Sequence, residues 1–206
     1  MNLIQIDKQV TGGLSQTSKM PCASYSLPAT ACKTGSKLAK IKGSVCHGCY
    51  ALKGFYNMPN VKRTLAFRLA AIKSKQWTES MTRQIQLTHK QYFRWHDSGD
   101  LQSVEHFDKI VRIVRATSHV QHWLPTKEPN IIRQWLKRGG SIPENLTIRI
   151  SASMIDSAHY TRVPGCLGSG VVTSGATCPA PQQGNTCGEC RTCWDKAVDF
   201  VTYHKH

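Results

Sequence analysis

Three cysteines at intervals of three residues, Cys187, Cys190 and Cys193, constrain this 206-residue chain more than any other feature of its sequence. A tight loop with this spacing projects three thiolates to one side, where they can bind different corners of a metal–sulfur cubane. Cys178, which precedes a proline, can supply the fourth thiolate. Bacterial ferredoxins combine the same elements, although their Cys-Pro follows the run. The spacing favours a four-iron, four-sulfur (4Fe-4S) cluster; zinc is the alternative metal, although its sites usually take paired Cys-x2-Cys knuckles.

A second set of cysteines lies in the first quarter of the chain, at Cys22, Cys32, Cys46 and Cys49. The surrounding stretch is rich in Gly, Ser, Pro and Lys and has little apolar periodicity, so something other than its own core must hold it in place. Metal ligation by these cysteines would do so. The spacing leaves open whether the two sets bind two clusters or share one. Cys166 stands apart and is expected to be a buried free thiol.

The sequence also indicates where such a chain would reside. No apolar run reaches the roughly 18 residues that a membrane span requires. The first residues lack the basic-then-apolar order of a secretion signal. We therefore expect a cytoplasmic protein that does not bind membranes. In that reducing compartment, thiols more often ligate metal or do chemistry than form structural disulfides.

Beyond residue 58, strand and helix patterns alternate along the chain. Apolar residues at Val61, Leu65, Leu69 and Ile72 follow the spacing of a helix with one buried face. The other expected elements are strands at 92–96, 120–124, 146–153 and 198–203 and helices at 79–90, 104–114 and 128–139. This alternation predicts βα units and a parallel sheet. The glycine-rich segment 163–185 is expected to be irregular.

These patterns predict one α/β domain over residues 1–206. Residues 1–58 would form a basic, loop-rich lobe, residues 59–160 a βα core, and residues 161–206 a cluster-binding loop and the last strand. Two of the predicted strands have a polar face, formed by Thr147, Arg149, Ser151 and Ser153 and by Arg94, His96 and Ser98. Parallel strands are normally covered on both sides, so a polar face favours the lining of a cavity. The alternative is an antiparallel strand with one face in water.

Six sequence segments together resemble a family of small phage-encoded and phage-related iron–sulfur proteins. They are KMPCASYSLPATACKTG, VCHGCYALKGFY, FRWHDSGDLQS, LPTKEPN, RISAS and CPAPQQGNTCGECRTCWD. The resemblance covers nearly the whole chain. It implies a partial (βα) barrel, similar to a shortened radical S-adenosylmethionine barrel, with a cluster at the carboxyl ends of its strands. If the protein is phage-encoded, its compartment is the host cytoplasm.

The same resemblance places several polar residues at strand ends that face the cluster. They are Ser98, Asp100, Thr126, Lys127, Ser151 and Ser153. The radical enzymes bind their cluster through Cys-x3-Cys-x2-Cys, which leaves one iron free to chelate the methionine part of S-adenosylmethionine. That motif is absent from this sequence. We therefore do not expect S-adenosylmethionine as a cofactor.

Four residues are candidates for catalysis. Asp100 and His96 can transfer protons, and Lys127 can bind an anion. Arg94 can bind a substrate carboxylate through two hydrogen bonds, as can Arg149 among the candidate substrate-binding residues. Structural roles are the alternatives: Asp100 can cap the loop before the next helix, and Lys127 can be an ordinary surface lysine.

The chain is strongly basic, with 27 Lys and Arg against 12 Asp and Glu, and residues 1–78 hold twelve of the former and a single acid, Asp7. This charge can attract a small anion, offset a thiolate-bound cluster, or bind phosphates of nucleic acid. The leading hypothesis is an iron–sulfur enzyme that acts on a small anionic substrate by Lewis-acid, sulfur-exchange or redox chemistry. The alternative is a zinc-stapled module that binds nucleic acid through the basic N-terminal lobe. The sequence does not predict an oligomeric state.

Overall fold

The computed structural model describes residues 2–205, which build an α/β fold around a seven-stranded sheet. The strands are β1 (Ser15–Gln16), β2 (Ala23–Tyr25), β3 (Tyr92–Trp95), β4 (Gln121–Thr126), β5 (Leu146–Ser151), β6 (Leu167–Val172) and β7 (Phe200–His204). They lie side by side in chain order. β1 pairs antiparallel with β2, and every other neighbouring pair is parallel. The predicted parallel sheet is therefore confirmed.

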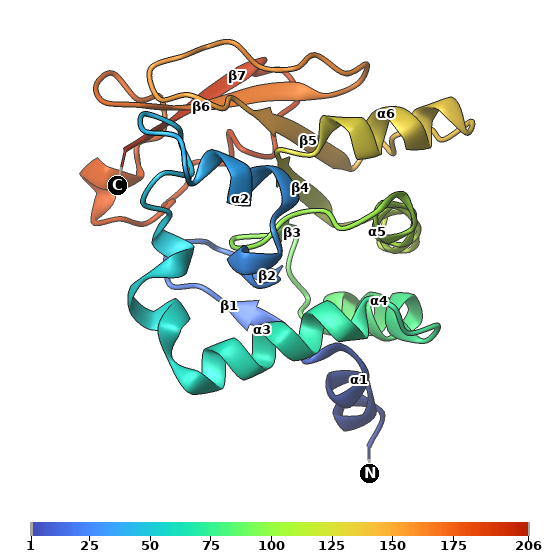
Figure 1. Cartoon of the computed structure of the whole chain (residues 1–206). Helices are drawn as coiled ribbons and strands as arrows, with labels where there is room; N and C mark the ends of the chain where they lie inside the picture. The colour runs from blue at the N-terminus through green and yellow to red at the C-terminus, as the bar shows by residue number, and fades with distance from the viewer. Residues whose placement is uncertain (1, 206) are drawn as a thin grey trace.

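The helices follow from the apolar periodicity over most of the chain. They are α1 (Leu3–Thr11), α2 (Lys33–Leu38), α3 (Pro59–Ala71), α4 (Trp77–Leu87), α5 (Val104–Ala116) and α6 (Pro129–Lys137). Short 3-10 turns lie at Ala29–Ala31, Tyr50–Leu52, Gly54–Asn57 and Ala180–Gln183. Figure 1 shows α4, α5 and α6 along one side of the sheet, where each packs on the next. Parallel strands joined by right-handed crossovers place their helices on one face in this way.

The main core lies between this helix layer and the sheet. Trp77, Trp95 and Phe107 are fully buried there. The helix α5 illustrates how the sequence specifies the arrangement, because Ser103 Oγ accepts a hydrogen bond of 3.1 Å from the backbone N–H of His106 at its first turn. Its apolar stripe then faces the sheet. The helix predicted at 104–114 is confirmed, and it has a serine cap and a buried apolar face.

The sheet is open. Within residues 2–205 no pairing joins β1 to β7, so the strands do not form a closed barrel. The first 58 residues contribute β1 and β2 to the sheet, and residues 161–206 contribute β6 and β7. The expected loop-rich N-terminal lobe is thus partly built into the sheet, and it also contains α1 and α2.

The prediction of an irregular segment at 163–185 was wrong, because β6 lies inside it. Glycines hid this strand. A Cβ on Gly168 would lie 2.4 Å from the rings of both Phe200 and Tyr160, so only glycine lets the two aromatic side chains pack over the strand. Strand propensity favours bulky side chains and therefore misses this segment.

The polar face of β5 does not line a cavity at its centre. The C-terminal segment 173–199 covers that face of the sheet, on the side away from the helices. Thr147 Oγ1 donates a hydrogen bond of 2.7 Å to the carbonyl oxygen of Trp194, and Trp194 Nε1 donates one of 3.0 Å to Phe93 O. The polar side chains satisfy the backbone of this covering loop, as buried polar groups must.

Candidate functional site

The structure sorts eight of the nine cysteines into two groups, and all nine are free thiols. The three-cysteine group comprises Cys32, Cys46 and Cys49. The five-cysteine group comprises Cys22, Cys178, Cys187, Cys190 and Cys193. Cys22 does not lie with the other N-terminal cysteines. It packs with Cys187 and Cys193 in a small hydrophobic cluster that contains Trp123 and Trp194. Cys166 packs instead against the main core.

The three-cysteine group lies at the carboxyl ends of the parallel strands. Cys32 caps α2, and Cys46 and Cys49 occupy the turn that follows. The backbone N–H of Val45 donates a hydrogen bond of 3.0 Å to Ser153 O, just beyond β5. The N–H of Thr34 donates one of 2.8 Å to Glu128 Oε1, just beyond β4. These two contacts hold the cysteine-bearing segment over the strand ends.

The sulfurs of Cys32 and Cys46 both lie close to Gly35. A Cβ on Gly35 would lie 3.6 Å from Cys46 Sγ and 3.7 Å from Cys32 Sγ. It would also lie only 3.0 Å from Cys32 Cβ. The absence of a side chain at Gly35 therefore leaves room beside both thiols.

Asp100 is buried beside this group. Its Oδ1 accepts hydrogen bonds from Thr126 Oγ1 at 2.6 Å and Leu101 N at 2.7 Å, and its Oδ2 accepts one from Lys127 N at 2.8 Å. Burial raises the pKa of Asp100 to about 6, although these hydrogen bonds oppose the shift. A carboxyl group with this pKa can gain or release a proton near neutral pH.

Lys127 provides positive charge at the same place. Its Nζ donates a hydrogen bond of 3.0 Å to Ala152 O. Burial lowers the pKa of Lys127, while the charges of Cys46 and Asp100 raise it. Burial raises the pKa of Cys46, and the charge of Lys127 acts in the opposite direction. Burial also raises the pKa of Cys32 to about 12, so this group needs a cation before it can hold its thiolates.

A cavity of about 320 Å³ adjoins the three-cysteine group. Thr34 of the cysteine-bearing segment lines this cavity, as do Lys127, whose charge acts on Cys46, and Ser153, which is hydrogen-bonded to Val45. Its other polar lining includes Asn130, Ser151, Ser157, His159 and Thr161. Hydroxyl groups, an amide, Lys127 and the carboxylate of Glu128 suit a small polar molecule, with Lys127 as the position for a negative charge. The structure therefore brings together Asp100, Thr126, Lys127, Ser151 and Ser153 from the sequence-predicted site.

The five-cysteine group lies on the face of the sheet away from the helices. Four of its members belong to the C-terminal loop, and Cys22 directly precedes β2. The N–H of Cys187 donates a hydrogen bond of 2.8 Å to Lys19 O, and the N–H of Cys178 donates one of 3.0 Å to Thr202 O. Cys193 Sγ lies 3.4 Å from the hydroxyl oxygen of Tyr203. The segment before β2 and the last strand thus hold the loop from two sides.

Arg149 fastens this loop to the centre of the sheet. Its guanidinium donates five hydrogen bonds of 2.7 to 3.2 Å to backbone carbonyl oxygens, at Gly168, Thr192, Cys193, Asp195 and Val198. An arginine has five N–H groups, so none is left for a substrate carboxylate in this arrangement. The predicted substrate-binding residue is used to hold the cysteine-rich loop.

Arg94, the candidate for carboxylate binding, lies within the five-cysteine group. Its guanidinium stacks over Trp123 at 4.5 Å, and Nη1 lies 3.3 Å from Met20 Sδ. Its Nε is shielded from solvent and has no hydrogen-bond partner among residues 2–205. Burial raises the pKa of Cys22 to about 12, and the positive charge of Arg94 opposes that shift.

The other predicted site residues on this part of the chain, His96 and Ser98, are buried and have structural surroundings. His96 is buried against Trp95 and His106, and neither of its ring nitrogens has a partner within the described residues. Burial holds the pKa of His96 well below the usual value, so the ring is neutral. Ser98 Oγ donates a hydrogen bond of 2.8 Å to Leu27 O. Arg94, His96 and Asp100 therefore follow one strand but face different surroundings.

Sequence reasoning missed Asp97, which anchors the segment that follows Cys49. Its Oδ2 accepts a hydrogen bond of 2.9 Å from Tyr56, and its Oδ1 accepts one of 3.0 Å from Ser24. Tyr50 donates to its backbone oxygen. The signal was its place directly after a predicted strand, where Asp100 was given the role instead.

A single metal ion and an iron–sulfur cluster require different spacings of their ligand side chains. Among residues 2–205, no three His, Cys, Asp or Glu side chains converge closely enough to share one metal ion. In a 4Fe-4S cluster each thiolate binds its own iron, so the ligands stand further apart than those of a single ion. Thiolates alone are the usual ligands of such clusters, and both groups consist of thiols. The donor chemistry of both groups therefore fits an iron–sulfur cluster.

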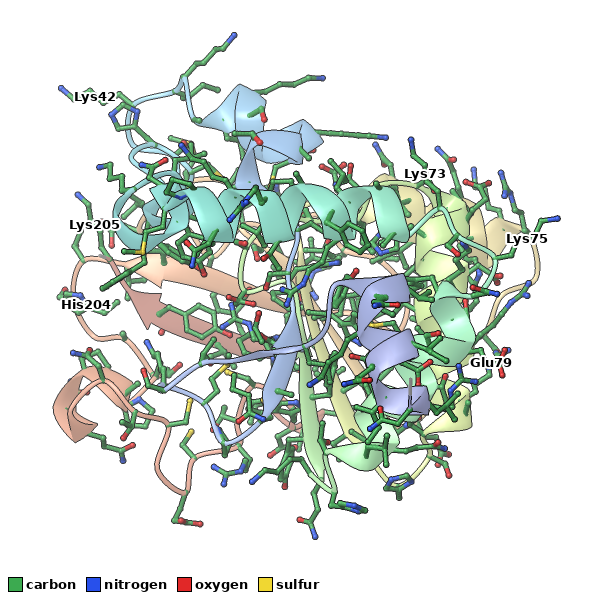
Figure 2. All side chains as sticks on the ribbon, turned by 90° about the horizontal axis from the view of Figure 1, so that it is seen from below. Lys42, Lys73, Lys75, Glu79, His204 and Lys205 are labelled. Atoms are coloured by element: carbon green, nitrogen blue, oxygen red, sulfur yellow. The ribbon has the colours of Figure 1, made fainter. Side chains whose placement is uncertain are left out.

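The basic side chains are spread over the surface. Figure 2 shows Lys42, Lys73, Lys75 and Lys205 pointing outward from different edges of the molecule. Lys33, Lys37 and Lys40 line a shallow groove on α2 next to Cys32.

Within residues 2–205, no helix has both the length and the apolar character that crossing a membrane would require.

Comparison with known proteins gives one match. No curated protein and no solved structure matches the chain. A family model described as Gene product 88, a family of phage-type gene products, matches residues 3–196. That span includes both cysteine groups and the cavity. The chain belongs to the Gene product 88 family.

Proposed function

We propose that this protein is an iron–sulfur enzyme whose 4Fe-4S cluster is held by Cys32, Cys46 and Cys49. The observation that carries the proposal is the placement of these three thiols at the strand ends, beside a buried lysine and a polar cavity. Catalytic sites of parallel βα sheets lie at this end of the strands. In this proposal the open sheet acts as a partial barrel, and the cavity at its mouth receives the substrate.

The proposed substrate is a small anion. Lys127 faces both the cavity and the thiols, so its ammonium group can hold a carboxylate or phosphate close to them. The hydroxyl groups of Ser151 and Ser153 can orient that anion. Asp100, with its pKa near 6, can accept or donate a proton next to the bound anion.

A cluster with three thiolate ligands supplies a Lewis-acid position at the iron that lacks a cysteine. The chain's own residues bind the anion, keep it beside that position and move protons. Hydrogen bonds to Glu128 and Ser153 hold the segment around α2 over the strand ends. We place the protein in the cytoplasm, where reduced thiols are available.

The test of ligation compares two cysteine variants of the anaerobically purified protein. Cys46→Ser should lose iron and acid-labile sulfide, whereas Cys166→Ser, a matched change outside both groups, should retain them. Full iron content in Cys46→Ser would refute the ligand assignment. Colourless protein that contains zinc and binds nucleic acid in a salt-dependent way would support the zinc-stapled alternative.

The test of anion binding uses citrate as a probe. Citrate should change the electron paramagnetic resonance spectrum of the reduced protein, because it would bind next to the cluster. Lys127→Met should lose this response, whereas Lys75→Met, at an exposed lysine, should keep it. A response that survives in Lys127→Met would place the anion elsewhere.

A further inference from the structure

The pKa of Arg94 is raised although the side chain is buried, because Tyr50, Asp97, Tyr203 and Cys193 favour its positive charge. No ion pair to Arg94 occurs in the described part of the chain, whose four salt bridges involve other arginines. Its guanidinium contacts Trp123 and Met20 and interacts with Tyr50, and its shielded Nε has no hydrogen-bond partner within the described residues. Shielding a cation from water is unfavourable unless an opposite charge compensates it.

Three thiols lie close to this arginine, together with Tyr50, Asp97 and Tyr203. Cys22 and Cys193 are both close enough for the charge of Arg94 to act on their pKa values. Burial raises the pKa of Cys193 to about 11, and the hydrogen bond to Tyr203 and the charge of Arg94 oppose this shift. Cys187 is close to both Arg94 and Cys178. A bound metal would convert these thiols into thiolates and so place further negative charge beside Arg94.

We propose that Cys22, Cys178, Cys187 and Cys193 bind a second 4Fe-4S cluster, with Arg94 as its counter-cation. This centre is distinct from the three-cysteine group and does not depend on the function proposed for that group. The covering loop is held in place by Arg149 and by the indole of Trp194. Four thiolates leave no iron without a cysteine ligand. The second cluster therefore stores or passes electrons and binds no substrate.

The choice of Cys22 over Cys190 goes against the sequence spacing. Cys22 is 4% exposed and packs in the cluster formed by Trp123 and Trp194. Cys190 Sγ is instead 3.2 Å from Thr192 Oγ1, outside that hydrophobic cluster. Apolar cover and a nearby positive charge both stabilise a buried thiolate cluster, and Cys22 has both.

Arg94 is a positioning residue in this proposal, because it acts on the cluster through its charge. Reduction adds one negative charge to a cluster that is already anionic, and a fixed positive charge nearby favours that step. Removing the charge should therefore move the reduction potential of the second cluster to a more negative value. Lysine at this position keeps the charge and should restore most of the potential.

The first experiment measures iron and acid-labile sulfide in anaerobically reconstituted full-length variants. Cys32→Ala/Cys46→Ala/Cys49→Ala should keep about half of the iron of the wild-type protein, because the second cluster remains. Cys22→Ser in that background should lose the rest, whereas Cys190→Ser in that background should retain it. Iron that survives Cys22→Ser, or is lost in Cys190→Ser, would overturn the ligand assignment. Zinc bound at this group in place of iron and sulfide would also overturn the proposal.

The second experiment is a redox titration of Arg94→Met and Arg94→Lys in the same background, followed by electron paramagnetic resonance. Arg94→Met should retain its iron but have a more negative potential than the parent, and Arg94→Lys should lie close to the parent. Circular dichroism of each variant reports whether the fold is intact. Equal potentials in a folded Arg94→Met variant and its parent would overturn the role of Arg94.

Discussion

Arg149 Nε donates a hydrogen bond of 3.1 Å to the carbonyl oxygen of Cys193, and so joins the centre of β5 to the cysteine-rich loop. The other four N–H groups of Arg149 bind carbonyls of the same loop and its flanks. A single buried side chain thus organises a segment that has almost no regular structure. The position of the five-cysteine group depends on it.

Replacing Arg149 with Met should destabilise the protein strongly. Several buried carbonyl oxygens would lose their donors, and each such loss costs about 1–3 kcal/mol. We expect a loss of at least about 3 kcal/mol in the free energy of unfolding. Chemical denaturation measures it. Arg138→Met, which removes an exposed ion pair to Glu105, should change stability by less than about 1 kcal/mol. Similar losses in the two variants would contradict the role of Arg149.

Gly35→Ala should reduce iron binding while leaving the metal-free fold intact. The new Cβ would enter the space between the sulfurs of Cys32 and Cys46. Alanine is a better helix former than glycine by about 1 kcal/mol, so α2 itself should not be weakened. Iron analysis and thermal unfolding of the metal-free protein separate the two effects. Normal iron content in Gly35→Ala would argue against a cluster between these thiols.

Removing Arg83 should leave a buried carboxylate without its partner. Arg83 Nη2 lies 2.6 Å from Oδ1 of Asp7, whose side chain is fully buried on α1. Hydrogen bonding to Arg83 lowers the pKa of Asp7. Arg83→Met should therefore cost about 3 kcal/mol, measured by urea unfolding at pH 7. Glu79→Gln, which removes the exposed second partner of Arg83, should cost less than about 1 kcal/mol. A stable Arg83→Met variant would refute this account of α1 docking.

Stability should fall as the pH falls below about 6.5, partly because of His122. His122 Nδ1 accepts a hydrogen bond of 3.3 Å from Trp95 Nε1, and Nε2 lies 2.8 Å from Thr117 Oγ1. Burial lowers the pKa of His122 to about 3, so the folded state keeps this ring neutral. The unfolded chain takes up the proton first, and the contribution is lost as the pH falls from about 6.5 toward 3.

The variant His122→Gln tests this pH dependence. Unfolding of the wild type between pH 6 and pH 4, values chosen to lie between the two pKa values of His122, should take up about one proton more than unfolding of the variant. The unfolding free energy of His122→Gln should therefore fall less steeply as the pH falls. His89→Asn is the control, because His89 is exposed and asparagine tolerates its left-handed backbone. An unchanged slope in His122→Gln would show that another group carries the effect.

The elements found from the sequence are those that bury an apolar face. β5 and α5 have clear periodicity, and the cap at Ser103 marks where α5 begins. The helix α1 was missed because its buried residues are polar: Asp7 and Thr11 face α4, while Leu3 and Ile4 are exposed. Hydrophobic periodicity cannot identify a helix that docks through an ion pair.

The sequence predicted which residues belong to the candidate site but not which of its cysteines lie together. The cysteine spacing identified eight thiols, and the strand ends identified Asp100 and Lys127. The spacing could not show that Cys22 joins the C-terminal cysteines, because that depends on the contact between Cys187 and Lys19 across the molecule. Nor could it show that Arg149 serves the loop, since a polar residue in a parallel strand predicts a cavity and a buried loop backbone equally well.

The central claim is that the thiols at the strand ends and under the C-terminal loop bind iron and sulfide. The most direct test is the analysis of iron, acid-labile sulfide and zinc in one anaerobic preparation of the full-length protein. The account predicts a brown protein with about eight irons and as many sulfides per chain, as two 4Fe-4S clusters require. A colourless protein with all nine thiols free, or with zinc and no sulfide, would contradict it.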